Sequence, residues 1–129
     1  MTPLDHPTFA AHARFRHALR RFLRFSEARA RAAGITPTQH QMLLAIRGEA
    51  RGWLSVGEIA RQLMIRPNSA AELVDRAVSQ GLAVKAADPD DARRLRVQLT
   101  DRGHALIEEV TADHRDELAR LWRRVPPPR

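Results

Sequence analysis

The sequence predicts a mainly α-helical fold with a small β-wing. Two short helical segments joined by three residues have helix-turn-helix proportions. A hairpin pattern follows them, and apolar residues recur at helical spacing near both ends of the chain. At 129 residues the chain has the usual size of one domain. We therefore expect a single domain, with a winged helix-turn-helix at about 35–99 and flanking helices at about 7–33 and 100–125.

Composition and charge limit the classes of protein to which the chain can belong. The formal net charge of +7 suits a polyanionic partner, although a merely basic soluble protein has the same balance. An aromatic content of 5% argues against a stacking surface for single-stranded nucleic acid. The absence of cysteine excludes disulfides, thiolate metal sites and thiol-based switches. With neither a signal-peptide pattern nor an apolar stretch of membrane-spanning length, a cytoplasmic protein is expected.

The first expected helix runs from about Pro7 to Arg31. Phe15, Leu19 and Phe22 recur along it at helical spacing, and arginines occupy much of the remainder. Gly34 is placed where a glycine ends a helix. The arginine-rich face is expected to be solvated and to raise the positive field of the protein.

The second expected helix begins at a capping box, Thr36–Gln39, with Pro37 at the first helical position. It ends near Gly48, and Trp53-Leu54 is expected to form a short strand. These elements lead directly into the helix pair.

The helix pair begins at a second capping box, Ser55–Glu58. Residues 64–66 form the tight turn, Pro67 begins the next helix at its favoured first position, and Gly81 ends that helix. In helix-turn-helix proteins this second helix enters the major groove, and its N-terminal end meets base edges.

The hairpin consists of strands near 82–85 and 95–99 around a turn rich in Asp and Pro. Asp90 and Asp91 are interpreted as turn residues rather than as a metal or acid–base pair, because no further ligands accompany them. Thr100 then caps the last helix, which the prolines at 126–128 end. Its apolar positions are Leu106, Val110, Leu118, Leu121 and Val125.

Arg66, Asn68 and Ser69 begin the second helix of the pair and are candidates for base contacts, since Asn pairs with adenine and Arg with guanine. The alternative is that they are surface or capping residues. Arg76 is expected to touch phosphate, and the basic hairpin is expected to meet phosphates or the minor groove. The expected DNA-binding residues are Ser55, Arg66, Asn68, Ser69, Glu72, Arg76, Arg93 and Arg94.

Residues 35–110 resemble the MarR family of bacterial winged helix-turn-helix regulators. The resemblance depends on the order and spacing of five segments, Ile35–Gln39, Leu54–Ala60, Leu73–Arg76, Gly81–Val84 and Asp88–Thr100. It implies a homodimeric, sequence-specific regulator of double-stranded DNA, a repressor that binds a near-palindromic operator and that a small-molecule effector releases. The alternative is a winged-helix interaction or architectural module with weak or no specific DNA binding.

The resemblance also implies roles for individual residues. Asp75 would pair with Arg93 and fix the angle of the wing, the alternative being a solvated acid. One departure from the family pattern concerns Glu72, where relatives often carry a basic or hydroxyl residue, and the neighbouring Ala71 offers no polar contact. The terminal helices would form the dimer interface through Phe15, Leu19, Phe22, Leu118, Leu121 and Trp122.

Two further expectations concern the C-terminal region and chemistry. The C-terminal region, residues 100–129, is long enough for one helix, whereas relatives often carry two. We therefore expect the cleft that binds effectors in the family to be small or missing. His114 falls on the apolar stripe of this helix and is interpreted as a dimer-core residue. The chain shows neither a nucleophile elbow, a phosphate loop nor metal-ligand spacing, so we expect no enzyme, metal or cofactor.

Overall fold

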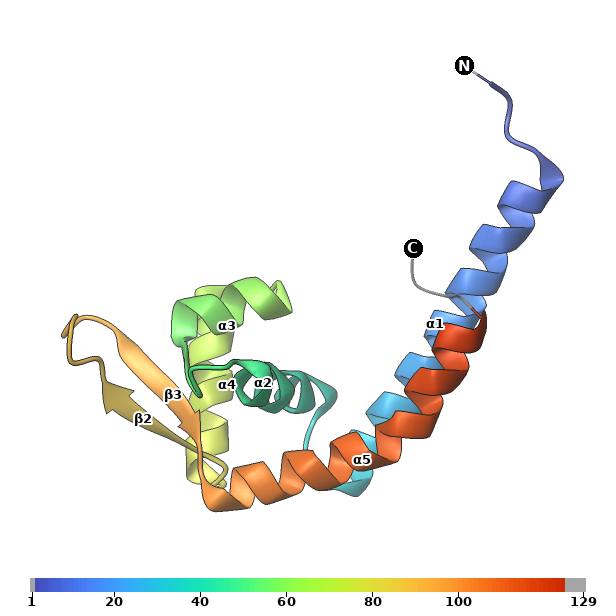
Figure 1. Ribbon diagram of the computed structural model, residues 1–129. Coiled ribbons are helices and arrows are strands. Elements are labelled where there is room, and N and C mark those ends of the chain that lie inside the picture. Colours follow the sequence, from blue (N-terminus) through green and yellow to red (C-terminus); the bar gives the residue numbers. More distant parts are fainter. Residues whose placement is uncertain (1, 125–129) are drawn as a thin grey trace.

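The computed structural model describes residues 2–124 and confirms a mainly α-helical fold with a small antiparallel sheet (Figure 1). Val125, expected on the last helix, lies outside the described residues. In chain order the elements are α1 (His6–Ala32), α2 (Pro37–Gly48), β1 (Leu54–Ser55), α3 (Val56–Leu63), α4 (Pro67–Ser79), β2 (Ala83–Ala87), β3 (Leu95–Leu99) and α5 (Asp101–Arg124).

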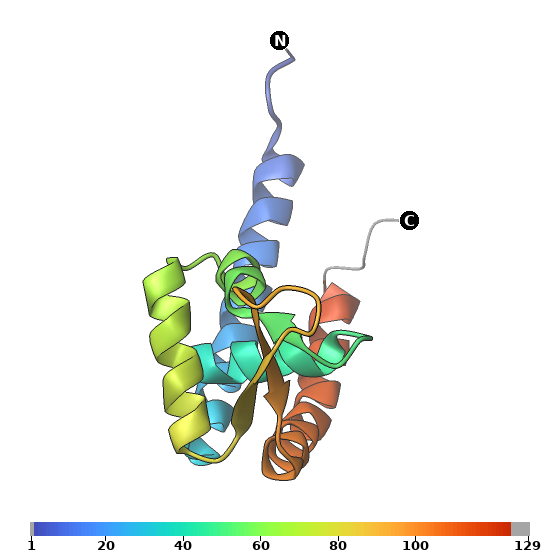
Figure 2. The same ribbon diagram turned by 90° about the vertical axis from the view of Figure 1, so that its left-hand side faces the viewer.

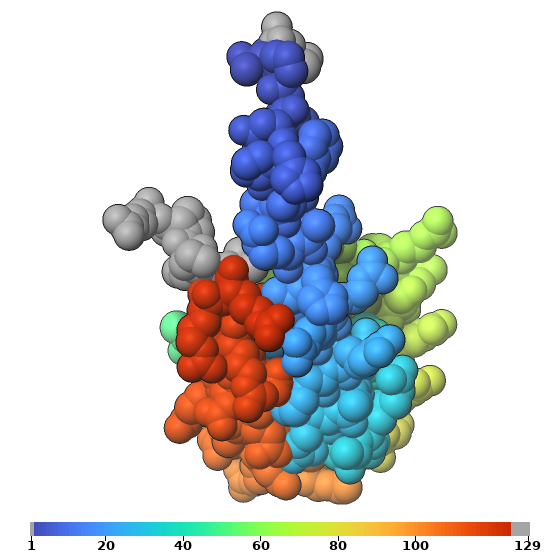
Figure 3. Space-filling model, turned by 90° about the vertical axis from the view of Figure 1, so that its right-hand side faces the viewer, coloured from blue at the N-terminus to red at the C-terminus, as the bar shows by residue number. Residues whose placement is uncertain are grey.

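The elements form a compact body and a helical arm (Figure 1). The body contains α2, α3, α4 and the three strands, and α1 and the C-terminal half of α5 lie side by side as the arm, which Figure 3 shows from its outer side. Arg29 of α1 fastens the two helices, with its Nε 2.6 Å from an Asp113 carboxylate oxygen. The N-terminal turns of α1 extend beyond the end of α5 (Figure 3).

The sheet has the strand order β1-β3-β2, and both pairings are antiparallel. In the wing, the hairpin formed by β2, β3 and residues 88–94, Ala83 is opposite Leu99 and Ala87 is opposite Leu95. The Asp88 carboxylate accepts a hydrogen bond from the Asp90 amide at 2.9 Å. Asp90 and Asp91 therefore lie in the turn, as their sequence context predicts.

Local signals in the sequence account for where the helices begin and end. Both capping boxes form, Thr36 with Gln39 and Ser55 with Glu58, each closed by reciprocal side-chain and backbone contacts. The turn after α3 contains Met64 with φ of 54°, a left-handed conformation that residues with a side chain rarely adopt. This conformation ends α3 and redirects the chain into α4.

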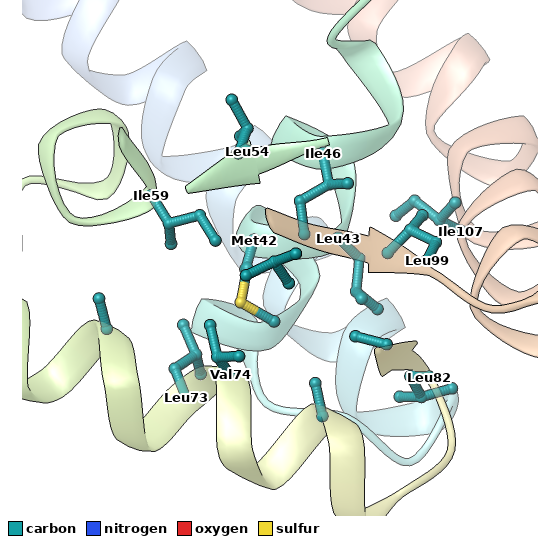
Figure 4. Packing of buried hydrophobic residues seen from close by; sticks show 14 of the residues in the cluster. Met42, Leu43, Ile46, Leu54, Ile59, Leu73, Val74, Leu82, Leu99 and Ile107 are labelled. Atoms are coloured by element: carbon teal, nitrogen blue, oxygen red, sulfur yellow. The ribbon is translucent and has the colours of Figure 1, made fainter. Parts of the chain in front are cut away.

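The core lies where the helix pair, the sheet and the first turns of α5 meet (Figure 4). Met42 and Leu43 of α2, Ile59 of α3 and Val97 of β3 are fully buried there. Ile107 brings α5 into the same cluster, so the body and the base of the arm share one core. The arm is thereby held at a defined angle to the helix pair.

Candidate nucleic-acid interface

Helix α4 has one buried face and one free polar face. Its buried residues, Ala70, Leu73, Val74 and Ala77, recur at helical spacing and pack into the core. Asn68, Ser69, Glu72 and Arg76 are exposed and follow one another at steps of one, three and four residues, so that they share the opposite face. Within the described residues Arg66 makes no side-chain cap bond, so its guanidinium is not committed to the helix start.

The wing lies beside α4 on the same face of the body (Figure 2). The Arg93 side chain in its turn is 95% exposed, although its Nε lies 3.6 Å from an Asp91 carboxylate oxygen. The Asp91 side chain also accepts a hydrogen bond from the Arg93 amide at 3.0 Å, which shapes the turn around this residue. The wing beside α4 therefore carries an exposed cationic side chain in its turn.

One predicted contact residue is placed elsewhere. Ser55, expected to touch DNA, is buried, and its hydroxyl donates to a Glu58 carboxylate oxygen at 2.8 Å. The hydroxyl also accepts from the Glu58 amide at 3.2 Å. The DNA contact of Ser55 stays a prediction, which its surroundings disfavour because the side chain is buried and its hydroxyl proton is already donated to Glu58.

The aspartate of α4 braces the wing, but through a different partner from the one expected. Asp75 accepts a hydrogen bond from the Lys85 ammonium at 2.8 Å, whereas Arg93 pairs with Asp91. The predicted Asp75–Arg93 pair is therefore corrected to Asp75–Lys85. The physical reason is reach: Lys85 lies on β2, which packs directly on α4, while Arg93 lies in the turn beyond the strands.

A second contact ties the wing to α3, and the sequence does not reveal it. The Glu58 carboxylate accepts a hydrogen bond from Arg94 at 2.5 Å and pairs with Arg51 from the loop before β1. Burial alone would raise the pKa of Glu58, but hydrogen bonds from Ser55, Arg51 and Arg94 outweigh it and lower the pKa to about 2. Glu58 is therefore ionised at any physiological pH.

Trp53 supports this ion-pair cluster. The Cζ atoms of Arg51 and Arg96 lie 3.9 and 4.1 Å from the centroid of its ring, within cation–π range. Arg96 also reaches the buried Asp88 carboxylate, at 3.3 Å. The sequence predicted Trp53 only as a strand residue. One arginine over its ring comes from the adjacent loop, but the other comes from a strand some forty positions away, which sequence spacing does not reveal.

The arm carries the apolar residues expected at a dimer interface. Phe15, Leu118 and Trp122 are exposed, with Trp122 at 48%, and Leu19, Phe22 and Leu121 are half-buried between α1 and α5 or beside them. Large apolar side chains at this exposure are typical of a surface that a partner covers.

A groove lies between the arm and α2, so the cleft expected to be small or missing is present. Its volume is about 870 Å³ and its lining is mainly apolar. The lining residues come from α1, α2 and α5 and include Phe22, Leu23, His40, Leu44, Ile107, Thr111, His114 and Leu118.

His114 lies at the inner wall of the groove rather than at a surface between subunits. It is only 8% exposed within the single chain, and its ring packs at 5.2 Å from Phe25 and 5.0 Å from His40. Its Nδ1 atom donates to the Val110 carbonyl oxygen at 2.7 Å, and its Nε2 atom is buried without a partner among the described residues. The interpretation as a dimer-core histidine is therefore wrong, because the helices of one subunit already bury it.

We expect the burial of His40 to make stability depend on pH. Burial is the main cause that lowers the pKa of His40, and the charges of His114 and Arg29 lower it further. Below its ordinary value of 6.5 the unfolded chain therefore binds more protons than the folded chain, so stability is lost as the pH falls from there. Urea unfolding should give a lower free energy at about pH 5.5 than at about pH 7.5. His40→Gln should reduce that difference, and an unchanged difference would contradict the assignment.

No helix in the range 2–124 is both long and apolar enough to cross a membrane. Within the same range, no three His, Asp or Glu side chains gather closely enough to hold a metal ion.

Comparison with known proteins agrees with this geometry. A family model described as MarR family matches residues 33–94. The HTH-type transcriptional repressor MdtR of Bacillus subtilis is 31% identical over 87 residues, which are 67% of this chain and 55% of that protein. The transcriptional repressor MprA of Escherichia coli K12 is 25% identical over 92 residues, covering 71% of this chain and 52% of that protein. The chain thus matches just over half the length of these relatives.

Solved structures share the fold over most of their length. AbsC, a MarR family transcriptional regulator from Streptomyces coelicolor, has a TM-score of 0.78 at 17% identity and covers 99% of this chain and 86% of its own. A probable transcriptional regulator from Pseudomonas aeruginosa has a TM-score of 0.68 at 28% identity and covers 84% of this chain and 79% of its own.

Proposed function

The chain belongs to the MarR family, and from this premise we propose that it is a homodimeric, cytoplasmic repressor that binds specific double-stranded DNA. One observation carries the proposal: α4, which has an exposed polar face, lies beside the wing, whose turn carries the exposed Arg93 (Figure 2). A helix in the major groove with a cationic wing beside it requires this arrangement. The proposed role is binding and not catalysis.

Each contact residue has a separate part in the proposal. Asn68 and Arg66, at the N-terminal end of α4, read base edges, and Ser69 contacts the backbone or a base beside them. Arg76 and Arg93 contact phosphate or the minor groove. Glu72 is a carboxylate on the contact face, where it can accept a hydrogen bond from cytosine N4 and disfavours other bases.

The dimer would form through the arms. A two-fold axis that pairs the exposed apolar residues of α1 and α5 leaves both copies of α4 free, because α4 lies on a different side of the body from the arm (Figures 1 and 2). Two such helices would bind half-sites about one helical turn apart, so the operator is expected to be nearly palindromic.

The groove offers a place for a small-molecule effector. It is bounded by the arm on one side and by α2 of the body on the other, so a ligand there touches both parts. A ligand that binds the DNA-incompetent arrangement more tightly would release the operator by shifting the population. The apolar lining favours a largely apolar molecule.

Selection of bound fragments from the genome of the source organism tests the proposed function. We expect a few fragments that share an inverted repeat, bound at least about 10³-fold more tightly than unrelated duplexes. Binding without sequence preference would instead favour an architectural module, and the absence of salt-dependent binding would favour a protein-interaction module.

Once an operator is selected, the start of α4 can be tested directly. Asn68→Ala and Arg66→Ala should each reduce discrimination against a changed base pair by about 1–3 kcal/mol, because each removes a bidentate contact. Anisotropy titrations with operator and single-substitution duplexes measure this change. Arg61→Ala, on the preceding helix, serves as the control that lowers charge by the same amount. Unaltered base preference in both α4 variants would show that another element reads the bases.

A further inference from the structure

The two neighbouring arginines of the wing have different surroundings. The Arg93 side chain is 95% exposed, whereas that of Arg94 is 41% exposed and donates to Glu58 at 2.5 Å. Arg94 immediately precedes β3, and Glu58 lies in the first turn of α3. The ion pair therefore joins the base of the wing's turn to the helix pair.

We propose that Arg94 is a positioning residue that Glu58 holds, and that it does not itself contact DNA. The Glu58–Arg94 pair fixes the angle of the wing, and this angle presents Arg93 to the phosphates. The proposal rests on the proposed DNA-binding function and goes beyond it, since it removes Arg94 from the contact residues expected from the sequence and assigns a role to Glu58.

The surroundings of Glu58 favour a fixed brace. Its carboxylate is only 19% exposed and accepts from Ser55 and Arg94 and from Arg51 of the loop before β1. Charge-assisted hydrogen bonds from two guanidinium groups to one partly buried carboxylate are strong and restrict its geometry. A guanidinium from 36 positions along the chain thus meets two local donors at this single carboxylate.

Trp53 and Asp88 contact the base of the wing through Arg96. Arg96 of β3 lies over the Trp53 ring at 4.1 Å and pairs with the Asp88 carboxylate, which lies at the end of β2. Arg94 lies 5.4 Å from the same ring. The aromatic ring therefore packs against the guanidinium groups that Glu58 and Asp88 orient, and leaves Arg94 little freedom to turn toward DNA.

The chain itself indicates a variant that removes the brace and keeps the fold. Glu58 closes the capping box of α3, and Gln39 closes the equivalent box of α2. Glu58→Gln should therefore preserve the cap while it removes the charge that attracts Arg94. Asp90→Asn is the matched control, because Asp90 is an exposed wing carboxylate that forms no ion pair within the described range.

The probe is a fluorescein-labelled, mixed-sequence duplex of about 30 base pairs, titrated at several KCl concentrations between about 50 and 200 mM. Arg93→Gln should reduce the slope of log affinity against log salt by about one, because one phosphate contact is lost. Arg94→Gln and Glu58→Gln should each weaken binding roughly three- to tenfold with a slope close to that of the parent. The double variant should be no weaker than either single one.

The sign of the Glu58 effect distinguishes the brace from simple electrostatics. Removing a carboxylate near DNA should strengthen binding, as we expect for Asp90→Asn, whereas loss of the brace weakens it. Tighter binding by Glu58→Gln, or a slope reduced by about one in Arg94→Gln, would overturn the proposal.

Amide hydrogen exchange tests the brace without DNA. Residues 88–94 should exchange faster in Glu58→Gln, and the increase there should exceed that of the core amides of α2, which follows the loss of overall stability measured by urea unfolding. Unchanged exchange would overturn the brace even if DNA binding were confirmed. If the parent protein fails to bind DNA while the wing exchanges faster in the variant, the proposed function fails and the brace remains.

Discussion

Gly103→Ala is expected to lower the free energy of unfolding by about 3 kcal/mol. A Cβ atom at this position would lie 2.1 Å from the Leu82 carbonyl oxygen, a backbone atom that cannot rotate away. Alanine normally stabilises a helix relative to glycine by about 1 kcal/mol, so helix propensity alone would predict a higher free energy of unfolding for the variant. The overlap prevails because relieving it requires α5 to move away from the core.

The surrounding contacts show why α5 cannot move without further loss. The Thr100 amide donates to the Leu82 carbonyl oxygen at 3.1 Å, and the Thr100 hydroxyl donates to the Gly81 carbonyl oxygen at 2.6 Å. The same hydroxyl accepts from the Gly103 amide at 3.1 Å and so caps the helix. A shift of α5 would break these bonds together and expose Ile107.

Urea unfolding of the parent and two glycine variants measures the effect. Gly57→Ala is the control, because the nearest atom to a Cβ there is the end of the Arg61 side chain at 3.7 Å. It should leave the free energy of unfolding unchanged or raise it by up to about 1 kcal/mol. Equal stability of the Gly103 variant and its parent would show that α5 does not approach Leu82 this closely.

The second large effect concerns the arm. Glutamate in place of both Phe15 and Trp122 should convert the proposed dimer into a folded monomer, because each substitution would place a charge in the proposed apolar interface. Since the two copies of α4 would then bind independently, affinity for a palindromic operator should fall by about 10²- to 10⁴-fold. Sedimentation velocity and anisotropy titration measure the two changes.

Leu44→Glu provides the matched control for the arm variant. Leu44 is similarly exposed but lies on α2 in the groove, away from both the arm's outer face and α4. This variant should remain dimeric. A parent protein that sediments as a monomer at micromolar concentration would exclude the proposed dimer.

Local signals in the sequence were enough to predict where the helices and the wing turn lie. The capping boxes at Thr36 and Ser55, the proline at the start of α4 and the Asp-rich turn place element boundaries, and the structure has them there. These signals act between residues three or four positions apart, so their physics is complete before the chain packs. The apolar spacing likewise predicted the buried face of α4.

Which charged and polar groups come into contact depends on tertiary packing. Asp75 pairs with Lys85 rather than Arg93, and Glu58 receives Arg94 from 36 positions along the chain. The sequence does not distinguish an arginine that is free at the surface from one that holds the wing, because a guanidinium pairs with any carboxylate that packing brings within hydrogen-bond distance. The groove and the burial of His114 depend in the same way on the angle at which the arm leaves the body, which the core around Ile107 sets.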